Sequence, residues 1–297
     1  MKRFAMFYVR NVLSNVTFKR SFHRNFHSFR QMNSDHIDRT ADSARSEVVS
    51  LATVVGMREE SKTVKSLTLK VEDKQFSFKA GQWIDMFIPG VETIGGFSMC
   101  SSPLRLTKYH CLDLAVKYSE HPPAYWIHTK CKVGEQVKIR VGGDFFFDPA
   151  VQKDVDLLLI AGGVGINPVY SIINEVSDLN KEDNSSRFSG KVKLLFSAKT
   201  TDELVFKEQL NIIQNNNEHI NCQFHVTREK ETTHKIGDVL LLNKRIQMGD
   251  LDNSFNWLRK ENTCVYICGP SHMIEDVELS LLQLNIAKQR IKYEKWW

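Results

Sequence analysis

The chain has 297 residues, 42% of them hydrophobic, and a formal net charge of +5, so it has room for two domains of ordinary size. The positive charge is concentrated at the amino terminus: residues 1–34 hold seven basic residues and no acidic one, while the rest holds 33 basic and 35 acidic residues. A body with a net charge of −2 is a poor candidate for binding a nucleic-acid backbone, so we expect no nucleic-acid partner.

The first segment, residues 1–44, is interpreted as a mitochondrial transit peptide followed by a linker. It lacks acidic residues before Asp35 and is rich in Arg, Ser, Asn and Phe, a composition typical of such peptides. Two alternatives stay open: a secretory signal, although its apolar run stops after six residues at Arg10, and a basic arm without a targeting role. No stretch approaches the roughly 20 apolar residues of a membrane span, so we expect no integral membrane segment. The composition of the first segment leads us to expect a mitochondrial location.

The six cysteines are scattered through the sequence without any C-x-x-C pair. This pattern is typical of a reduced compartment and offers no ligand set for zinc or an iron–sulfur cluster, so no metal is predicted. The cysteines are Cys100, Cys111, Cys131, Cys222, Cys264 and Cys268.

The second segment, residues 45–149, is predicted to be an antiparallel β-barrel or a sandwich-like β domain. It contains short β-rich runs, among them "TVKSLTLKV", "QFSFK", "WIDMFIP" and "CLDLAVKY", separated by glycine-containing turn signals. Many short strands at this spacing favour a closed β architecture. One helix is expected to interrupt it, at "PPAYWIHTK", residues 122–130.

The third segment, residues 150–297, alternates apolar strand patterns with helical ones. Such alternation predicts a parallel sheet with helices on both faces, whose ligands bind beyond the carboxyl ends of the strands. Three candidate segments follow predicted strands: residues 161–168, 226–229 and 268–270. We therefore expect them to meet at one edge of this α/β domain.

The first of these segments reads "AGGVGINP" and follows the apolar run "DVDLLLI". Glycines that lead from a strand directly into a helix expose backbone N–H groups at the positive end of the helix, where a phosphate binds. The spacing differs from the G-x-G-x-x-G of the common dinucleotide fingerprint. A nucleotide site of another family is favoured, and the alternative is a tight turn that binds no ligand.

The order of the β domain, "IAGGVGINP", "YICGP" and the ending "YEKWW" resembles the ferredoxin-NADP reductase superfamily of flavin-dependent reductases over roughly residues 46–297. The resemblance implies a flavin-binding barrel holding FAD and an α/β domain holding NAD(P)H, with Cys268 as a catalytic residue beside the nicotinamide ring. The nucleotide-binding residues that it implies are Gly162, Gly163, Val164, Gly165, Ile166, Asn167, Gly269 and Pro270.

The flavin motif of the family, R-x-Y-S-x-x-S, corresponds here to residues 95–101, "GGFSMCS". The resemblance implies that Phe97 stacks on the flavin ring and that Ser98 bonds near its N5, with Met99, Cys100 and Ser101 completing the site. Gly95 replaces the arginine that holds the flavin phosphate, and the second phosphate signal, G-x-x-[ST], is missing at "HPPAYWIH". We therefore expect weak flavin binding, a substitution by Arg105 or Lys117, or a strand that binds no flavin.

Two further positions are implied by the resemblance. The family's carboxyl-terminal glutamate and aromatic residue match Glu294, as a catalytic residue, and Trp296, as a cap on the flavin; the alternative is that Trp296 packs without a function. Thr227 and Arg228 resemble the [ST]-R-E of NADP users, since a cation and a hydroxyl suit a 2′-phosphate.

These observations predict an NAD(P)H oxidoreductase that passes hydride to flavin and on to a separate, unidentified acceptor. The flavin would supply the chemistry because it accepts two electrons and releases them singly. Restoring the family arginine, as Gly95→Arg, is expected to tighten flavin binding. The rival hypothesis is a non-catalytic nucleotide-binding protein, a sensor or an assembly factor, whose flavin site has decayed.

Overall fold

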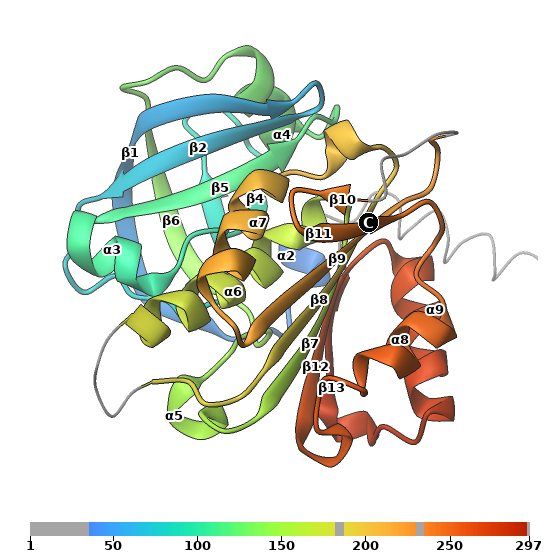
Figure 1. The fold of residues 1–297 in the computed structure, drawn as a ribbon. Helices are drawn as coiled ribbons and strands as arrows, with labels where there is room; N and C mark the ends of the chain where they lie inside the picture. The colour runs from blue at the N-terminus through green and yellow to red at the C-terminus, as the bar shows by residue number, and fades with distance from the viewer. Residues whose placement is uncertain (1–35, 182–186, 230–234, 296–297) are drawn as a thin grey trace, which may run out of the picture. The chain divides into compact units, whose positions relative to one another are not determined.

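A computed structural model describes residues 36–181, 187–229 and 235–295 (Figure 1). The chain divides into two compact units, residues 1–42 and 43–297, and each is considered by itself. In the first unit the described part contains one short helix, α2 (His36–Arg39). Residues 1–35 of the predicted transit peptide lie outside the described residues, and so does Trp296.

The first half of the second unit is a six-stranded antiparallel sheet that curls into a nearly closed barrel. Its strand order is β4-β3-β6-β1-β2-β5, and an isolated bridge between Met99 and Leu114 joins the two ends. Alternate residues of the strands point inward, as in β2, where Leu67 and Leu69 are buried. The strands are β1 (Arg45–Ser61), β2 (Val64–Val71), β3 (Trp83–Phe87), β4 (Gly95–Ser98), β5 (Cys111–Lys117) and β6 (Gln136–Gly142).

Two local features of the barrel differ from the sequence-based expectation. Residues 75–79 alternate as a strand would, and Phe76 and Phe78 are buried in the barrel core, but the backbone forms no ladder there. A helix that the pattern did not predict, α3 (Pro103–Tyr109), begins with Pro103 and ends at His110 in the left-handed conformation. The expected helix, α4 (Pro122–Thr129), is present.

The second half contains a seven-stranded sheet in the order β10-β11-β9-β8-β7-β12-β13, with only β10 antiparallel to its neighbour. Every residue of β7 and β12 is buried, which explains their continuous apolar runs. The strands are β7 (Asp156–Gly162), β8 (Val192–Ala198), β9 (Ile220–Val226), β10 (Lys235–Ile236), β11 (Val239–Leu242), β12 (Thr263–Gly269) and β13 (Ile291–Lys295).

Helices cover both faces of this sheet, as Figure 1 shows. One face packs against α6 and α7 and is continuous with buried residues of the barrel, and the other packs against α8 and α9. The helices are α5 (Pro149–Gln152), α6 (Ile166–Lys181), α7 (Lys207–Asn216), α8 (Met248–Ser254) and α9 (Ser271–Gln283). The predicted fold class, a β-barrel followed by an α/β parallel-sheet domain, is confirmed.

The chain order creates a crevice between β7 and β12. From β7 the chain continues to β8 and β9 on one side of the sheet, and β12 and β13 lie on the other side. The connections after β7 and β12 therefore diverge, and ligands bind in the crevice outside the carboxyl ends of strands at such a switch point. The glycine-rich segment and residues 268–270 lie at this crevice.

A polar stripe on α6 joins the α/β half to the barrel. Asn167 Nδ2 donates to the carbonyl of Ala115 at 2.6 Å, and Ser171 Oγ donates to the carbonyl of Ser101 at 2.7 Å. Asn174 Nδ2 donates to the carbonyl of Cys100 at 3.2 Å, and the Ser102 hydroxyl donates to Asp178 Oδ2 at 2.6 Å. Positions 167, 171, 174 and 178 follow the helical period, so one face of α6 contacts the barrel along its length.

Candidate functional site

The glycine-rich segment forms a sharp turn at the carboxyl end of β7. Gly162 ends the strand, residues Gly163–Gly165 form one 3-10 turn, and α6 begins at Ile166. Gly163 has φ +55°, and a Cβ there would meet no atom within 4 Å. The left-handed backbone conformation, and not crowding, favours glycine at this position. The space next to Gly163 is open.

The other two glycines allow close packing against the neighbouring turn. A Cβ on Gly162 would lie 2.8 Å from Pro270 Cδ and from Met273 Sδ, and a Cβ on Gly165 would collide with the backbone of Cys268. The turns after β7 and β12 therefore approach each other more closely than residues with a Cβ atom at positions 162 and 165 would permit. Gly162, Gly163 and Pro270 line the resulting cavity.

The remaining predicted residues of this turn face inward. Ile166 is fully buried, and Val164 packs against the same apolar cluster. The Asn167 side chain is buried, with Nδ2 on the Ala115 carbonyl and Oδ1 without a partner among the described atoms. These three residues support the turn through packing and through the bond to the barrel.

Cys268 and Gly269 end β12 beside the glycine turn. Cys268 is fully buried, and Glu294 lies opposite it in the pairing of β12 with β13. Burial raises the pKa of the Cys268 thiol well above its ordinary value, and the Glu294 carboxylate raises this pKa further. Cys268 is therefore a neutral thiol at physiological pH.

Ser98 connects the barrel to Glu294, the residue that lies opposite Cys268. Its Oγ donates a hydrogen bond to Glu294 Oε2 at 3.3 Å, across 196 positions of sequence. Ser98 lies at the end of β4 and Glu294 in β13. The three predicted catalytic residues, Ser98, Cys268 and Glu294, thus converge from three strands of both halves.

The other residues of the predicted flavin motif are mostly enclosed. Met99 is fully buried, Cys100 is 3% exposed and Ser101 is 5% exposed. The Ser101 hydroxyl accepts a hydrogen bond from the backbone N–H of Asp113 at 3.0 Å. Phe97 is partly buried and packs against the barrel core. Ser98 is 6% exposed and thus about as buried as Ser101, and among these five side chains Phe97 alone is partly exposed.

The corner where the family arginine would stand is filled. A Cβ on Gly95 would lie 2.5 Å from Phe97 Cε2 and 2.8 Å from Pro123 Cβ. The expectation that Gly95→Arg alone tightens flavin binding is therefore not supported by the structure, since an arginine would first have to displace the Phe97 ring and the start of α4.

A cavity of about 340 Å³ lies at the carboxyl ends of β7, β8 and β9. Three exposed basic side chains line it, Lys199, Arg228 and Arg245, and none of them has an ionic partner within the described residues. Thr227 also lines the cavity, and its hydroxyl donates to the Ala198 carbonyl at 3.4 Å. Unpaired cations beside a glycine turn favour a ligand with phosphate groups.

Glu229, the acidic neighbour of Arg228, is held by another group. Its Oε1 accepts hydrogen bonds from the backbone N–H and the hydroxyl of Thr201, at 2.6 and 2.8 Å. The Glu229 carboxylate is therefore hydrogen-bonded to the turn that follows β8.

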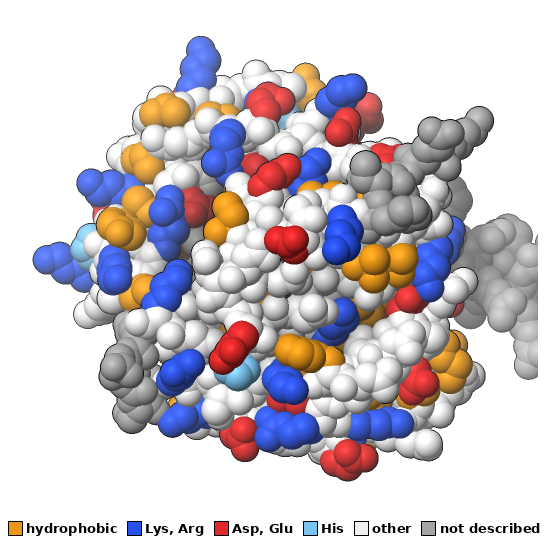
Figure 2. Space-filling model, viewed as in Figure 1, with side chains coloured by type: hydrophobic (Ala, Val, Ile, Leu, Met, Phe, Trp, Pro, Cys, Tyr) orange, Lys and Arg blue, Asp and Glu red, His pale blue; other side chains and the backbone are white. Residues whose placement is uncertain are grey.

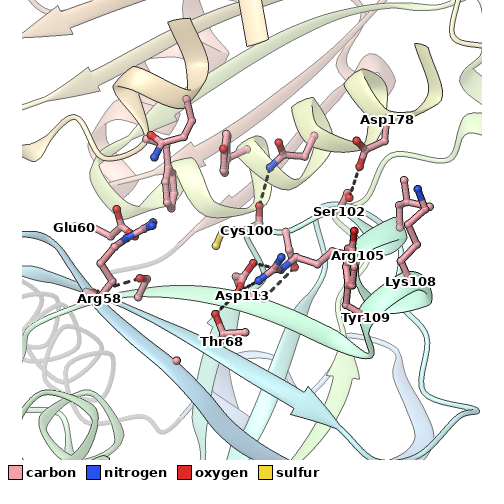
Figure 3. Close-up of a pocket in the computed structure, with 18 of the residues that line it drawn as sticks. Arg58, Glu60, Thr68, Cys100, Ser102, Arg105, Lys108, Tyr109, Asp113 and Asp178 are labelled. Carbon is pink, nitrogen blue, oxygen red and sulfur yellow. Dashed lines mark hydrogen bonds and ion pairs between the residues drawn. The ribbon is translucent and has the colours of Figure 1, made fainter. Parts of the chain in front are cut away.

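A larger groove of about 740 Å³ lies between the barrel and α6 (Figure 3). Most of its charged side chains neutralise one another, as in the pairs Arg58–Glu60 and Arg105–Asp113, both at 2.5 Å. Thr68 Oγ1 also donates to Asp113 at 2.7 Å. Because three of its four basic side chains, all but Lys108, already have acidic partners, this groove is a weaker candidate for an anionic ligand than the smaller cavity.

Basic and acidic side chains are intermixed over the face of the molecule that Figure 2 shows. Within the described ranges, helices are too short or too polar to cross a bilayer.

Arg245, which lines the cavity, was not predicted from the sequence as a binding residue. It lies in the loop after β11, which is parallel to β9, so its loop reaches the same edge of the sheet as Thr227 and Arg228. The rule that ligands bind at the carboxyl ends of parallel strands would have identified it if "VLLL" had been predicted as a strand of that sheet.

The barrel followed by a nucleotide-binding α/β sheet is the architecture of the ferredoxin-NADP reductases. The ferredoxin NADP+ reductase from Neisseria gonorrhoeae with bound FAD and NADP superposes with a TM-score of 0.66 at 19% identity, covering 84% of this chain and 99% of that one. The FAD/NAD binding domain of nitric oxide dioxygenase from Vibrio cholerae gives 0.66 at 24% identity, covering 83% and 98%.

Residues 159–279 match the model of the oxidoreductase NAD-binding domain family. The chain belongs to the family of proteins called Oxidoreductase NAD-binding domain-containing protein 1. It is 45% identical to the protein of that name from Danio rerio over 89% of this chain and 97% of that protein, and 44% identical to the one from Homo sapiens over 89% and 85%.

Proposed function

We propose that this chain is an NAD(P)H oxidoreductase of the mitochondrion that passes hydride from nicotinamide to a flavin and on to a separate acceptor. The observation that carries the proposal is the convergence of Ser98, Cys268 and Glu294 beside the glycine turn. A flavin supplies the chemistry because it takes up a hydride and releases electrons singly.

Each of the three residues has a distinct task. Cys268, a small neutral thiol, leaves room for the nicotinamide ring and adds no charge beside it. The Ser98 hydroxyl, which now donates to Glu294 Oε2, is able to donate to a ring nitrogen instead. By accepting the hydrogen bond from Ser98, Glu294 keeps the hydroxyl oriented.

The three unpaired cations support NADPH, or the use of both cofactors. NADPH carries a 2′-phosphate, and Lys199, Arg228 and Arg245 line the cavity at the strand ends. The glycine turn would hold the pyrophosphate.

The test is NAD(P)H oxidation by purified protein with added flavin and a one-electron acceptor dye. Glu294→Gln and Ser98→Ala should each lower kcat by about 10²-fold, because general acid–base and polar contacts at a reacting centre typically contribute that much. Glu218→Gln, an exposed glutamate at the amino end of β9, is the matched control and should not change kcat. Wild-type rates in both site variants would refute the proposal.

The second candidate is a non-catalytic nucleotide-binding protein. It is favoured by one observation, the filled corner at Gly95. Binding of NADPH without absorbance or turnover in the presence of any flavin would support this candidate over the enzyme.

A further inference from the structure

The helix that should bind the flavin phosphates begins with two prolines. A helix start leaves four N–H groups without intrahelical partners, and these groups bind phosphate. In α4 the first intrahelical bond runs from the Tyr125 N–H to the His121 carbonyl at 2.9 Å, so the four positions are residues 121–124. Pro122 and Pro123 have no N–H, which leaves only the donors of His121 and Ala124.

The side chains that the sequence offered for the missing phosphate contacts do not supply them. The Gly95 corner is occupied by the Phe97 ring and Pro123. Of the two basic residues that the sequence offered as substitutes, Arg105 is paired with Asp113 at 2.5 Å. The other, Lys117, lies 3.5 Å from Glu203. The residues present therefore do not fit the diphosphate half of FAD.

The residues on the ring side are arranged differently. Ser98 and Glu294 are hydrogen-bonded, Cys268 is paired with Glu294 in register, and Phe97 lies at the barrel edge. We infer that this chain recognises a flavin through its ring alone, so that the flavin is an exchangeable co-substrate and not a resident group. The inference rests on the proposed function and specifies its substrate class: riboflavin, FMN and FAD.

The reaction balances without a bound prosthetic group. One NAD(P)H gives up a hydride, water supplies one proton, and the products are NAD(P)+ and a two-electron-reduced flavin that leaves the site. The reduced flavin then carries electrons to the separate acceptor.

The inference predicts similar affinities for the three flavins. In a site built for the diphosphate, each charge-assisted hydrogen bond to phosphate contributes about 10-fold or more in affinity, so FAD would bind far more tightly than riboflavin. Here the dissociation constants should agree within about 3-fold, because the ring contacts are common to all three.

The experiment is a fluorescence titration of the full chain with riboflavin, FMN and FAD, followed by desalting of the FAD complex. Similar constants and complete loss of flavin on desalting support the inference. An FAD constant at least 30-fold lower than that of riboflavin, or FAD retained stoichiometrically, would overturn it and leave the proposed function intact. If NADPH binds and none of the flavins does, both fall.

A double substitution, Pro122→Gly with Pro123→Ser, adds two N–H donors to α4. Binding of FMN and FAD should tighten by about 10-fold, and that of riboflavin should not change. Pro149→Gly, at the start of α5, is the matched control and should alter none of the three. Equal tightening of riboflavin would contradict phosphate recognition at this helix. The wild-type comparison decides the question if the double variant does not fold.

Discussion

Arg228→Ala should weaken NADPH binding and leave NADH binding nearly unchanged. Arg228 lines the cavity at the strand ends together with Lys199 and Arg245, and it has no ionic partner within the described residues. Its acidic neighbour is held by Thr201. The guanidinium is therefore available for the phosphate that distinguishes the two cofactors.

The size of the effect follows from exposure. A hydrogen bond to a charged group contributes about 1.5 to 3 kcal/mol, and the lower value applies to an exposed side chain such as Arg228, because solvent and salt screen it. About 1.5 kcal/mol corresponds to roughly a 10-fold rise in the dissociation constant for NADPH. The change for NADH should stay below about 2-fold, since it lacks the phosphate.

The assay is isothermal titration calorimetry with each cofactor at low and high salt. Arg58→Ala, which removes a paired arginine from the larger groove, is the matched control and should affect neither cofactor. Equal losses for NADPH and NADH in Arg228→Ala, or an NADPH constant that does not depend on salt, would refute the assignment of the 2′-phosphate to this cavity.

Three other predictions concern stability and processing. Asp85→Asn should lower the free energy of unfolding in urea by about 3 to 5 kcal/mol, because this fully buried carboxylate bonds two arginines of the barrel; Asp148→Asn, which removes an exposed pair, should change it by less than about 1 kcal/mol. Burial lowers the pKa of His225 to about 4, so the unfolded state binds the proton first, and stability present above pH 6.5 should decline by up to about 3 kcal/mol as pH falls to about 4. A His225→Gln variant unfolded at pH 7.5 and 5 should lack this decline, and an unchanged pH profile would rule out His225 as its source. Protein from isolated mitochondria should begin between residues 30 and 45 on amino-terminal sequencing; a chain beginning at Met1 would contradict a transit peptide.

The parts of the fold that were predictable depend on local sequence. Alternating patterns identified most barrel strands, and the glycine turn with its following helix was evident because residues 162–168 are contiguous. Residues 75–79 illustrate the limit. Two buried phenylalanines give a strand-like alternation, but a backbone ladder also requires a partner strand, which the pattern does not report.

The parts that were not predictable depend on contacts between distant residues. Asn167 matched a nucleotide motif, whereas its side chain bonds the Ala115 carbonyl 52 positions away. The Phe97 ring fills the corner at Gly95 because Pro123 lies next to it, and no local pattern indicates this. The convergence of Ser98 with Glu294 was implied by the resemblance, since their separation in sequence gives no physical reason to pair them.

The polar stripe on α6 limits how this protein is able to exchange parts with its relatives. A chimera cut near residue 150 would combine a foreign barrel with an α6 whose four polar positions need specific partners. Asn167, Ser171 and Asn174 bind backbone carbonyls, which any similar barrel supplies, but Asp178 requires a hydroxyl at position 102. A graft that lacks this hydroxyl would leave Asp178 with its ion pair to Lys181 on the same helix, and the two halves would lose the hydrogen bond between their side chains at the seam.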